Sequence, residues 1–508
     1  INMAEPRFPI ISSHIRAKGP AYRRLFDYFL VVAHQRSKLS RVWKKIQAIE
    51  KVANGVAAQN EENEDNGIKR GEDREGNDDD DEDGDKCYID SKAKYRDLAH
   101  KLEVLSTAVK PKIISRCPIW EHHDYPLAKG VASFAFPYGT RIKDLRSGET
   151  SPRCFSFVLT SPEGSKQYGA TLIFDEHISI EQDEDTVATT TAEEKSSTPP
   201  PFQAVASKAL VILSHHPYFN QMEELLKMVF RISICKKHPY DIERIIWLIV
   251  RDMPLPVEPN NRLDFEMYEK RISFQGPGYV ERLPLLHCKF GMLFELVSHD
   301  HIVAAVMLLL QEYKLVLVSD YSSVLVHCAE SLRALLYPLE WQSVYIPLLP
   351  SAAKNVLLAP VPFFVGLKPE LLADLVDEEP LNSNIAILNI DKGVLELPSP
   401  APKSLPSKIK NRLMNALLIH DPSSSIHRAN KLSAENMKKR DLAFPMGTEA
   451  IRLDQKDEEI KQEHHVETTR LLKIRSTFFE VLLSGILTGY KRYIITPKDA
   501  APAVAAPA

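Results

Sequence analysis

The stretch from Leu332 to Pro362, LRALLYPLEWQSVYIPLLPSAAKNVLLAPVP, constrains the fold more than any other part of the chain. Proline fixes its own φ and cannot donate a backbone hydrogen bond, so it seldom lies inside a helix or a central strand. The prolines here therefore mark the points where apolar elements end and turn. The pattern predicts a buried crossover rather than a catalytic loop. We expect its structural signature to be Tyr337, Pro338, Trp341, Pro347, Pro350 and Pro362, with Pro360 as a further turn.

The composition is that of a globular protein of more than one unit, with 508 residues and a net charge of −4. Residues 61–85 alone hold fourteen acidic and three basic residues, so the rest of the chain sums to +7. That modest positive charge suits an acidic partner or an anionic membrane surface, and it is much smaller than the positive charge typical of a nucleic-acid-binding protein. The six cysteines form no CxxC pair, which favours a reducing, cytoplasmic setting. We also expect no membrane span and no secretory signal.

The first half of the chain predicts an antiparallel strand meander backed by helices. Strand-like runs occupy 24–33, 131–137, 154–161, 168–176 and 210–217, with Gly and Ser-Pro turns between them. Apolar residues at helical spacing follow at 222–230 and 242–249. Residues 92–109 also have helical character.

In the second half, strands and helices alternate. Ser298 is a candidate N-cap for a helix that begins near His299. The run 314–320, KLVLVSD, is typical of a strand buried on both faces of a parallel sheet. A helix over 322–336 and strands over 343–349, 362–367 and 385–391 come next. This order predicts an α/β fold with a doubly wound sheet.

The motifs of common active sites and metal sites are missing. There is no GxxxxGK, no GxGxxG after a strand, no GxSxG and no HExxH. Adjacent histidines at 122–123, 215–216 and 464–465 point apart on a regular element and so are a poor metal site. Asp79, Asp81, Asp83 and Gly84 approach a calcium loop, but its twelfth position is Asp90 instead of glutamate.

The loop SDYSS follows the buried strand at its carboxyl end, where open α/β sheets place their working loops. Its hydroxyl groups are candidates to contact a partner, and helix capping by Ser322 or Ser323 is an equal alternative. The candidate partner-binding residues are Ser319, Asp320, Tyr321, Ser322 and Ser323. Among the aromatic residues, Tyr321 is the best interface candidate.

Together these segments resemble a tripartite DENN domain. The resemblance rests on LFDYFLVV (25–32), DYPLAKGVASFAFPYG (124–139), residues 293–350, APVPFFVGL (359–367), NIDKGVLELP (389–398), LPSKIKNRL (405–413) and FFEVLLSGILTGYKRYI (478–494). It implies two lobes, the first longin-like and the second a doubly wound α/β lobe with a helical end. The implied division is a first lobe at 8–251 with an acidic insert at 50–90 and a spacer at 181–201, a linker at 252–283, a second lobe at 284–420, a mobile insert at 421–470 and a helical segment at 471–497.

The resemblance implies guanine nucleotide exchange on a Rab-family small GTPase. Such a factor performs no covalent chemistry and has no cofactor of its own, because Mg²⁺ and GDP or GTP belong to the GTPase. It also implies peripheral recruitment to vesicle or endosomal membranes, and no nucleic-acid partner. Two alternatives stay open. One is GTPase activation by a loop arginine, for which Arg141, Arg146 and Arg153 are candidates, and the other is a non-catalytic scaffold that binds a Rab.

Overall fold

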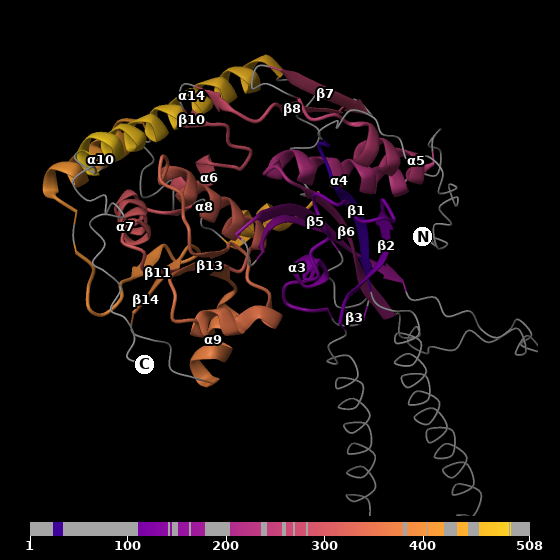
Figure 1. The fold of residues 1–508 in the computed structure, drawn as a ribbon, viewed down its shortest axis with the longest axis horizontal. Helices are drawn as coiled ribbons and strands as arrows, with labels where there is room; N and C mark the ends of the chain where they lie inside the picture. The colour runs from indigo at the N-terminus through magenta and orange to yellow at the C-terminus, as the bar shows by residue number, and fades with distance from the viewer. Residues whose placement is uncertain are drawn as a thin grey trace, which may run out of the picture.

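The computed structural model describes the two halves of the chain and most of their connections (Figure 1). The described residues are 24–33, 110–140, 143–144, 151–161, 164–177, 204–234, 241–256, 261–267, 270–280, 283–378, 384–403, 405–420, 434–444, 457–486 and 488. The acidic insert, the spacer at 181–201, the run 92–109 and the calcium-like loop at 79–90 lie outside them.

An antiparallel sheet forms the first half. Its strand order is β2-β1-β6-β5-β4, with β3 also paired to β6. The strands are β1 (Tyr28–Ala33), β2 (Lys112–Cys117), β3 (Lys143–Asp144), β4 (Arg153–Thr160), β5 (Lys166–His177) and β6 (Ala204–Ser214). Helix α4 (Phe219–Ile234) packs against β4, β5 and β6, and α5 (Ile242–Trp247) packs on α4 and continues into a π-helical turn at Leu248–Asp252. The predicted antiparallel sheet backed by helices is confirmed.

One predicted strand in this half is wrong. Residues 131–137 begin with a short helix, α3 (Val131–Ala135), which Pro137 and Gly139 end. Val131 and Ala135 are both fully buried while the residues between them are only partly so. A spacing of four residues places two side chains on one face of a helix, and small residues made this segment look like an alternating strand.

The second half is a five-stranded sheet of order β12-β13-β11-β14-β15. Strands β11 (Lys314–Val318), β12 (Val344–Ile346), β13 (Phe363–Leu367) and β14 (Ile385–Asn389) are parallel, and β15 (Val394–Glu396) is antiparallel to β14. The central strand, β11, is buried along its whole length, as its apolar run predicts.

Side chains alternate between two cores across this sheet. Leu315 and Leu317 belong to the core beneath α7 (His299–Leu310) and α8 (Ser322–Leu335), whereas Val316 and Val318 belong to a second core. The second core includes Leu357 and Leu371, from the 3-10 helix Ser351–Leu358 and α9 (Pro369–Glu378). Ser298 caps α7 as predicted, its side chain accepting from the backbone N–H of His301.

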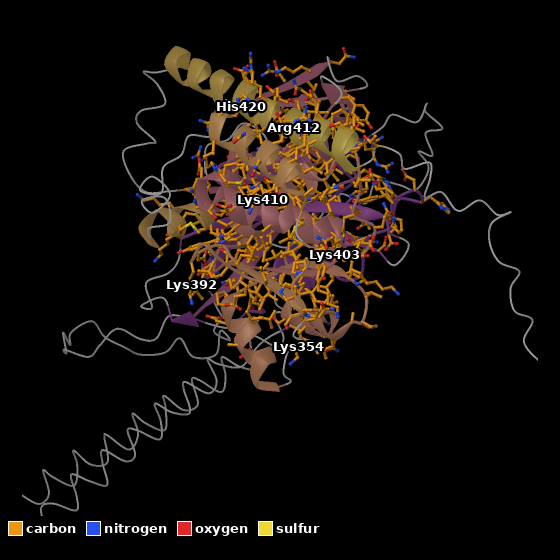
Figure 2. The ribbon with its side chains drawn as sticks, turned by 90° about the vertical axis from the view of Figure 1, so that its left-hand side faces the viewer. Lys354, Lys392, Lys403, Lys410, Arg412 and His420 are labelled. Carbon is orange, nitrogen blue, oxygen red and sulfur yellow. The ribbon has the colours of Figure 1, made fainter. Side chains whose placement is uncertain are left out.

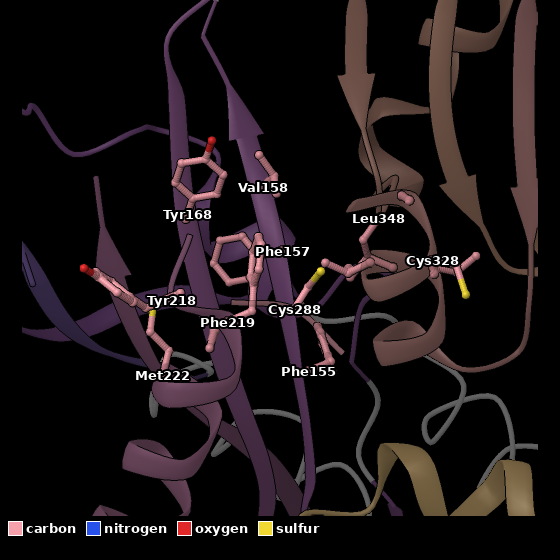
Figure 3. Packing of buried hydrophobic residues seen from close by; sticks show 14 of the residues in the cluster. Phe155, Phe157, Val158, Tyr168, Tyr218, Phe219, Met222, Cys288, Cys328 and Leu348 are labelled. Atoms are coloured by element: carbon pink, nitrogen blue, oxygen red, sulfur yellow. The ribbon is translucent and has the colours of Figure 1, made fainter. Parts of the chain in front are cut away.

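Both halves share one continuous hydrophobic core. Strand β4, at the edge of the first sheet, packs against α4 on one side and α8 on the other, and every residue from Cys154 to Leu159 is buried. Figure 3 shows Phe155 of β4 on one side of this junction and Leu348 of the second half on the other. Because the core is shared, the two halves form one packed body.

The remaining elements include the long helix and the hairpin at the upper edge of Figure 1. They are the hairpins β7 (Arg262–Met267) with β8 (Lys270–Gln275) and β9 (Tyr279–Val280) with β10 (Leu283–Pro284), and the helices α6 (Gly291–Leu296), α10 (Ser407–His420), α12 (Ala434–Asp441) and α14 (Asp457–Val481), which ends in a π-helical turn at Leu482–Ile486. None of the helices in the described ranges has the length and apolar character that crossing a bilayer requires.

Candidate functional site

The SDYSS loop lies at the carboxyl end of β11. The carboxylate of Asp391, which follows the neighbouring strand β14, binds the first two residues of this loop. Asp391 follows β14, which pairs in parallel with β11. Its Oδ1 accepts a hydrogen bond from Ser319 Oγ at 2.7 Å and its Oδ2 accepts one from the backbone N–H of Asp320 at 2.7 Å. Burial raises the pKa of Asp391, and these hydrogen bonds only partly oppose the shift.

A second carboxylate holds the other half of the loop, where α8 begins. Asp441, the last residue of α12, accepts from the backbone N–H groups of Ser322 and Ser323, both at 2.9 Å. These are first-turn amides that have no partner within the helix, so Asp441 acts as the cap of α8 from a distant segment. Burial raises the pKa of Asp441 as well. The alternative of capping by Ser322 or Ser323 is not found: α8 has no side-chain cap of its own, and Ser323 Oγ donates instead to the Arg440 carbonyl at 3.2 Å.

The loop therefore offers a partner fewer groups than its sequence suggests. Ser319, Ser322 and Ser323 are buried and bonded within the molecule. Asp320 is exposed and Tyr321 is partly exposed. Of the five candidate residues, these last two are the ones that a docking protein could reach.

Residues 434–444, which we name the strap, connect the SDYSS loop to the first half. Besides the Asp441 cap, Arg440 donates to Glu295 of α6 at 3.0 Å. In the next residues, Leu442 forms a β-bridge with Arg153, and the Ala443 N–H donates to the Pro152 carbonyl at 2.8 Å.

The end of the strap packs on α4. The ring of Phe444 stacks on Phe230 at 5.8 Å between centroids, and the guanidinium of Arg231 lies 4.8 Å from the Phe444 centroid. The strap lies within the stretch 421–470 that the sequence analysis expects to be a mobile insert, and two of its residues, Met437 and Ala443, are buried.

A buried ionic cluster joins the two halves near the strap. Glu223 of α4 is 2% exposed, and its carboxylate accepts hydrogen bonds from Ser156 Oγ of β4 at 2.9 Å and from Lys289 Nζ at 3.1 Å. His327 of α8 lies with Nε2 3.4 Å from Glu223 Oε1, and its Nδ1 accepts the Lys289 backbone N–H. Burial alone would raise the pKa of Glu223, but Lys289, His327 and Lys227 outweigh it and hold that pKa well below its ordinary value.

A second polar contact joins the halves beside β12. Glu330 of α8 accepts from Tyr345 Oη at 2.7 Å and from Arg333 at 2.6 Å. The carbonyl of Tyr345 in turn accepts from Thr160 Oγ1, at the end of β4, at 2.8 Å. Buried polar groups that are fully bonded fix one relative placement of the elements that carry them.

The proline-rich signature, predicted at Tyr337, Pro338, Trp341, Pro347, Pro350 and Pro362, surrounds β12 and follows α8. Trp341 is buried and donates from Nε1 to the Val344 carbonyl at 3.1 Å, and Tyr337 stacks on Phe479 of α14 at 5.3 Å between centroids. Pro347 and Pro350 are buried and Pro338 and Pro362 partly buried. Pro347 also explains Gly366 in β13, because a Cβ there would lie 2.2 Å from the Pro347 carbonyl oxygen.

The other candidates of the sequence analysis do not converge on a site. Arg153 is exposed but starts β4, so it lies in a paired strand, while Arg141 and Arg146 are outside the described residues. His122 Nε2 lies 3.1 Å from the backbone carbonyl of the buried Asp27, and His215 Nδ1 lies 2.8 Å from the carboxylate of the same residue. Within the described ranges, no three His, Cys, Asp or Glu side chains are grouped closely enough to hold a metal ion.

Sequence reasoning missed Asp391, Asp441 and Glu223. Asp391 alone had a usable signal, because two parallel strands that pair bring the residues after them to the same edge of the sheet. Asp441 lies 119 positions from Ser322, and nothing local to either residue predicts the contact.

Two family models match segments of this chain. The family model described as the uDENN domain matches residues 111–174, and the one described as the DENN (AEX-3) domain matches residues 205–393. The chain contains a uDENN and a DENN domain. The two matches cover the first sheet from β2 onward, the junction, and the second sheet through β14.

Among curated proteins, the MAP kinase-activating death domain protein of Caenorhabditis elegans is 25% identical over 361 residues. The match covers 61% of this chain and 25% of that protein. The chain thus spans about a quarter of the length of this relative.

Proposed function

We propose that this protein is a guanine nucleotide exchange factor for a Rab-family small GTPase. The observation that carries the proposal is the pair of family matches, uDENN and DENN, which together reach across both halves of the molecule. We assign the first half to a longin-like lobe and the second to a doubly wound α/β lobe, with the boundaries at 8–251 and 284–420 given by the sequence. The helical segment from 471 completes the tripartite unit.

The mechanism needs a rigid surface rather than a reactive group. An exchange factor binds the switch regions of the GTPase in a conformation that disturbs its Mg²⁺ and phosphate contacts, and so favours the nucleotide-free state. A thousandfold faster release of GDP requires about 4 kcal/mol of such differential binding. The shared core and the Glu223 and Glu330 contacts fix the two halves against each other, which suits this role.

We place the GTPase against the junction, with Asp320 and Tyr321 in contact. Both belong to the loop at the carboxyl edge of the parallel sheet, and the Asp391 and Asp441 bonds fix the backbone on either side of them. A pre-organised loop loses little conformational entropy on binding. In this proposal Mg²⁺ and nucleotide remain ligands of the GTPase, and the protein works in the cytoplasm and at vesicle surfaces.

The test is the release of fluorescent GDP from a panel of Rab proteins. We expect at least one Rab to lose GDP faster, and Asp320→Arg to reduce that stimulation roughly tenfold or more, as for a central interface residue. Tyr279→Ala changes a residue of β9 that is 63% exposed and lies outside the SDYSS loop, and it serves as the control that should leave the stimulation unchanged. A panel with no accelerated Rab contradicts exchange. Faster phosphate release from a GTP-loaded Rab would instead indicate GTPase activation. Tight binding to a Rab with unchanged rates of nucleotide release would indicate a non-catalytic scaffold.

A further inference from the structure

A basic surface runs along one side of the second half. Between residues 391 and 420 the chain has five Lys or Arg side chains and two carboxylates, although its net charge is −4. The five cationic residues are all exposed: Lys392, Lys403, Lys408, Lys410 and Arg412. Figure 2 looks onto this side and labels Lys392, Lys403, Lys410 and Arg412 across it, together with Lys354 and His420.

Helix α10 gives this surface its form. Its inner face is buried through Leu413, Ala416 and Leu417. The outer stripe reads Lys408, Arg412, Asn415 and Ile419, which are spaced four, three and four residues apart and so lie on one side of a helix. The sequence of α10, SKIKNRLMNALLIH, has no acidic residue. Arg412 also contacts α14, with Nη1 3.2 Å from Ser484 Oγ and Nη2 3.5 Å from Glu480 Oε2.

Large apolar side chains stand beside these cations. Ile419 is 72% exposed and its neighbour Leu418 is 57% exposed, on the same helix as three of the cations. Val394 and Leu397, between Lys392 and Lys403 in the chain, are 48% and 54% exposed. A single exposed apolar residue is ordinary, but apolar side chains set among lysines are the composition of a surface that lies at a membrane interface.

The carboxylates of this stretch do little to cancel its charge. Asp391 faces inward, where its oxygens bond to Ser319 and to the Asp320 amide. Glu396 is exposed on β15 and is the one carboxylate of the 391–420 stretch left toward solvent. Glu480 of α14 offsets the charge of Arg412, so the excess of positive charge comes from the four lysines, and it matches the negative potential of an anionic leaflet.

We propose that the outer face of α10, with the neighbouring 392–403 segment, docks this protein onto an anionic lipid bilayer. The lysines approach the headgroups, and Leu418 and Ile419 insert among them. Lys392 follows Asp391, which supports the SDYSS loop, but residues 403, 410, 418 and 419 belong neither to that loop nor to its Asp391 and Asp441 supports, so substitutions there test membrane docking independently of the exchange activity proposed above.

The test is co-flotation with phosphatidylcholine vesicles that contain or lack phosphatidylserine. We expect binding to the phosphatidylserine vesicles and its loss at high salt, because exposed charges are screened. Each lysine near the surface changes partitioning about fivefold, so Lys403→Gln with Lys410→Gln should weaken binding by about 25-fold. Both side chains are exposed, so this variant should keep the melting temperature of the native protein.

The matched control is Lys110→Gln with Lys129→Gln, two exposed lysines of the first half that carry the same total charge change. It should bind almost as the native protein does. A separate variant, Leu418→Ser with Ile419→Ser, should weaken binding even at low salt, since it removes insertion and leaves the charges in place. The proposal is overturned if the native protein ignores phosphatidylserine or if both lysine pairs weaken binding equally. GDP release measured without vesicles should be the same in all these variants.

Discussion

The Glu223 cluster allows a stability prediction with a sharp control. Replacing Glu223 by glutamine preserves the shape of the side chain and an acceptor for Ser156, but removes the negative charge that faces Lys289 and His327. Removing one partner of a buried ion pair typically costs about 3–5 kcal/mol. The Lys289 side chain is 41% exposed and can turn toward water, so we expect a smaller loss, about 2 kcal/mol of unfolding free energy.

The measurement is chemical and thermal unfolding of the native protein and two single variants. Glu224→Gln is the control, because Glu224 is the next residue of α4 and pairs with Lys227 at the surface, at 34% side-chain exposure. A surface pair contributes about 0–1 kcal/mol. A loss of about 2 kcal/mol corresponds to a melting temperature lower by about 2–3 °C in a chain of this size.

The pH dependence gives the same prediction a second readout. The folded-state pKa of Glu223 is depressed, so its contribution is present above the ordinary value of 4.5 and is lost as the pH falls through the lower folded pKa. The difference between the native protein and Glu223→Gln should therefore be full at pH 7 and shrink in acid. The reasoning is refuted if Glu223→Gln is no less stable than Glu224→Gln at pH 7, or if their difference grows as the pH falls.

Three further predictions concern other parts of the framework. Gly366→Ala should abolish the cooperative thermal transition, because its Cβ would lie 2.2 Å from the Pro347 carbonyl oxygen, whereas Gly130→Ala, with no atom nearer than 3.9 Å, should fold normally. Asp441→Ala should lower the unfolding free energy by about 1–2 kcal/mol through loss of the α8 cap, and Asp441→Asn by less, both read from denaturant midpoints. Burial, and secondarily the charge of His216, lowers the pKa of His287 from 6.5 to about 4. Between pH 6.5 and 4 this histidine is therefore protonated in the unfolded chain and neutral in the folded protein. Stability should therefore fall by about 2 kcal/mol between pH 6.5 and 4, and His287→Phe should flatten that part of the curve.

The elements that the sequence predicts well are those whose signals are local. The apolar run of β11, the Ser298 cap of α7 and the helical spacing of α4 each lie within a few residues, and each is found where it was expected. The helix α3 was missed because five small and apolar residues fit a strand as well as a helix. Whether such a short segment becomes a helix or a strand depends on its tertiary contacts.

The site is less predictable because its bonds join distant parts of the chain. Ser319 and Ser323 look like surface hydroxyls in sequence, yet Asp391 and Asp441 reach them across 72 and 118 positions. The sequence of a short polar loop does not indicate whether its hydroxyl and amide groups will form hydrogen bonds with water or with a distant carboxylate. The strap shows the same limit, since it lies in the stretch 421–470 expected to be a mobile insert, and nothing local to it predicts its contacts with both halves.

The shared core restricts how this protein can accelerate nucleotide release. Hinge motion between the halves would have to separate Glu223 from Lys289 and His327 and expose the apolar core around β4, and uncovering buried apolar surface costs about 25 cal/mol per Å². A fixed platform is therefore the cheaper mechanism. Variants of the junction should then lose exchange activity only as far as they lose stability, while Asp320→Arg, at an exposed position, should lose activity with its melting temperature unchanged. A junction variant that gains exchange activity while losing stability would instead indicate that separation of the halves is part of the mechanism.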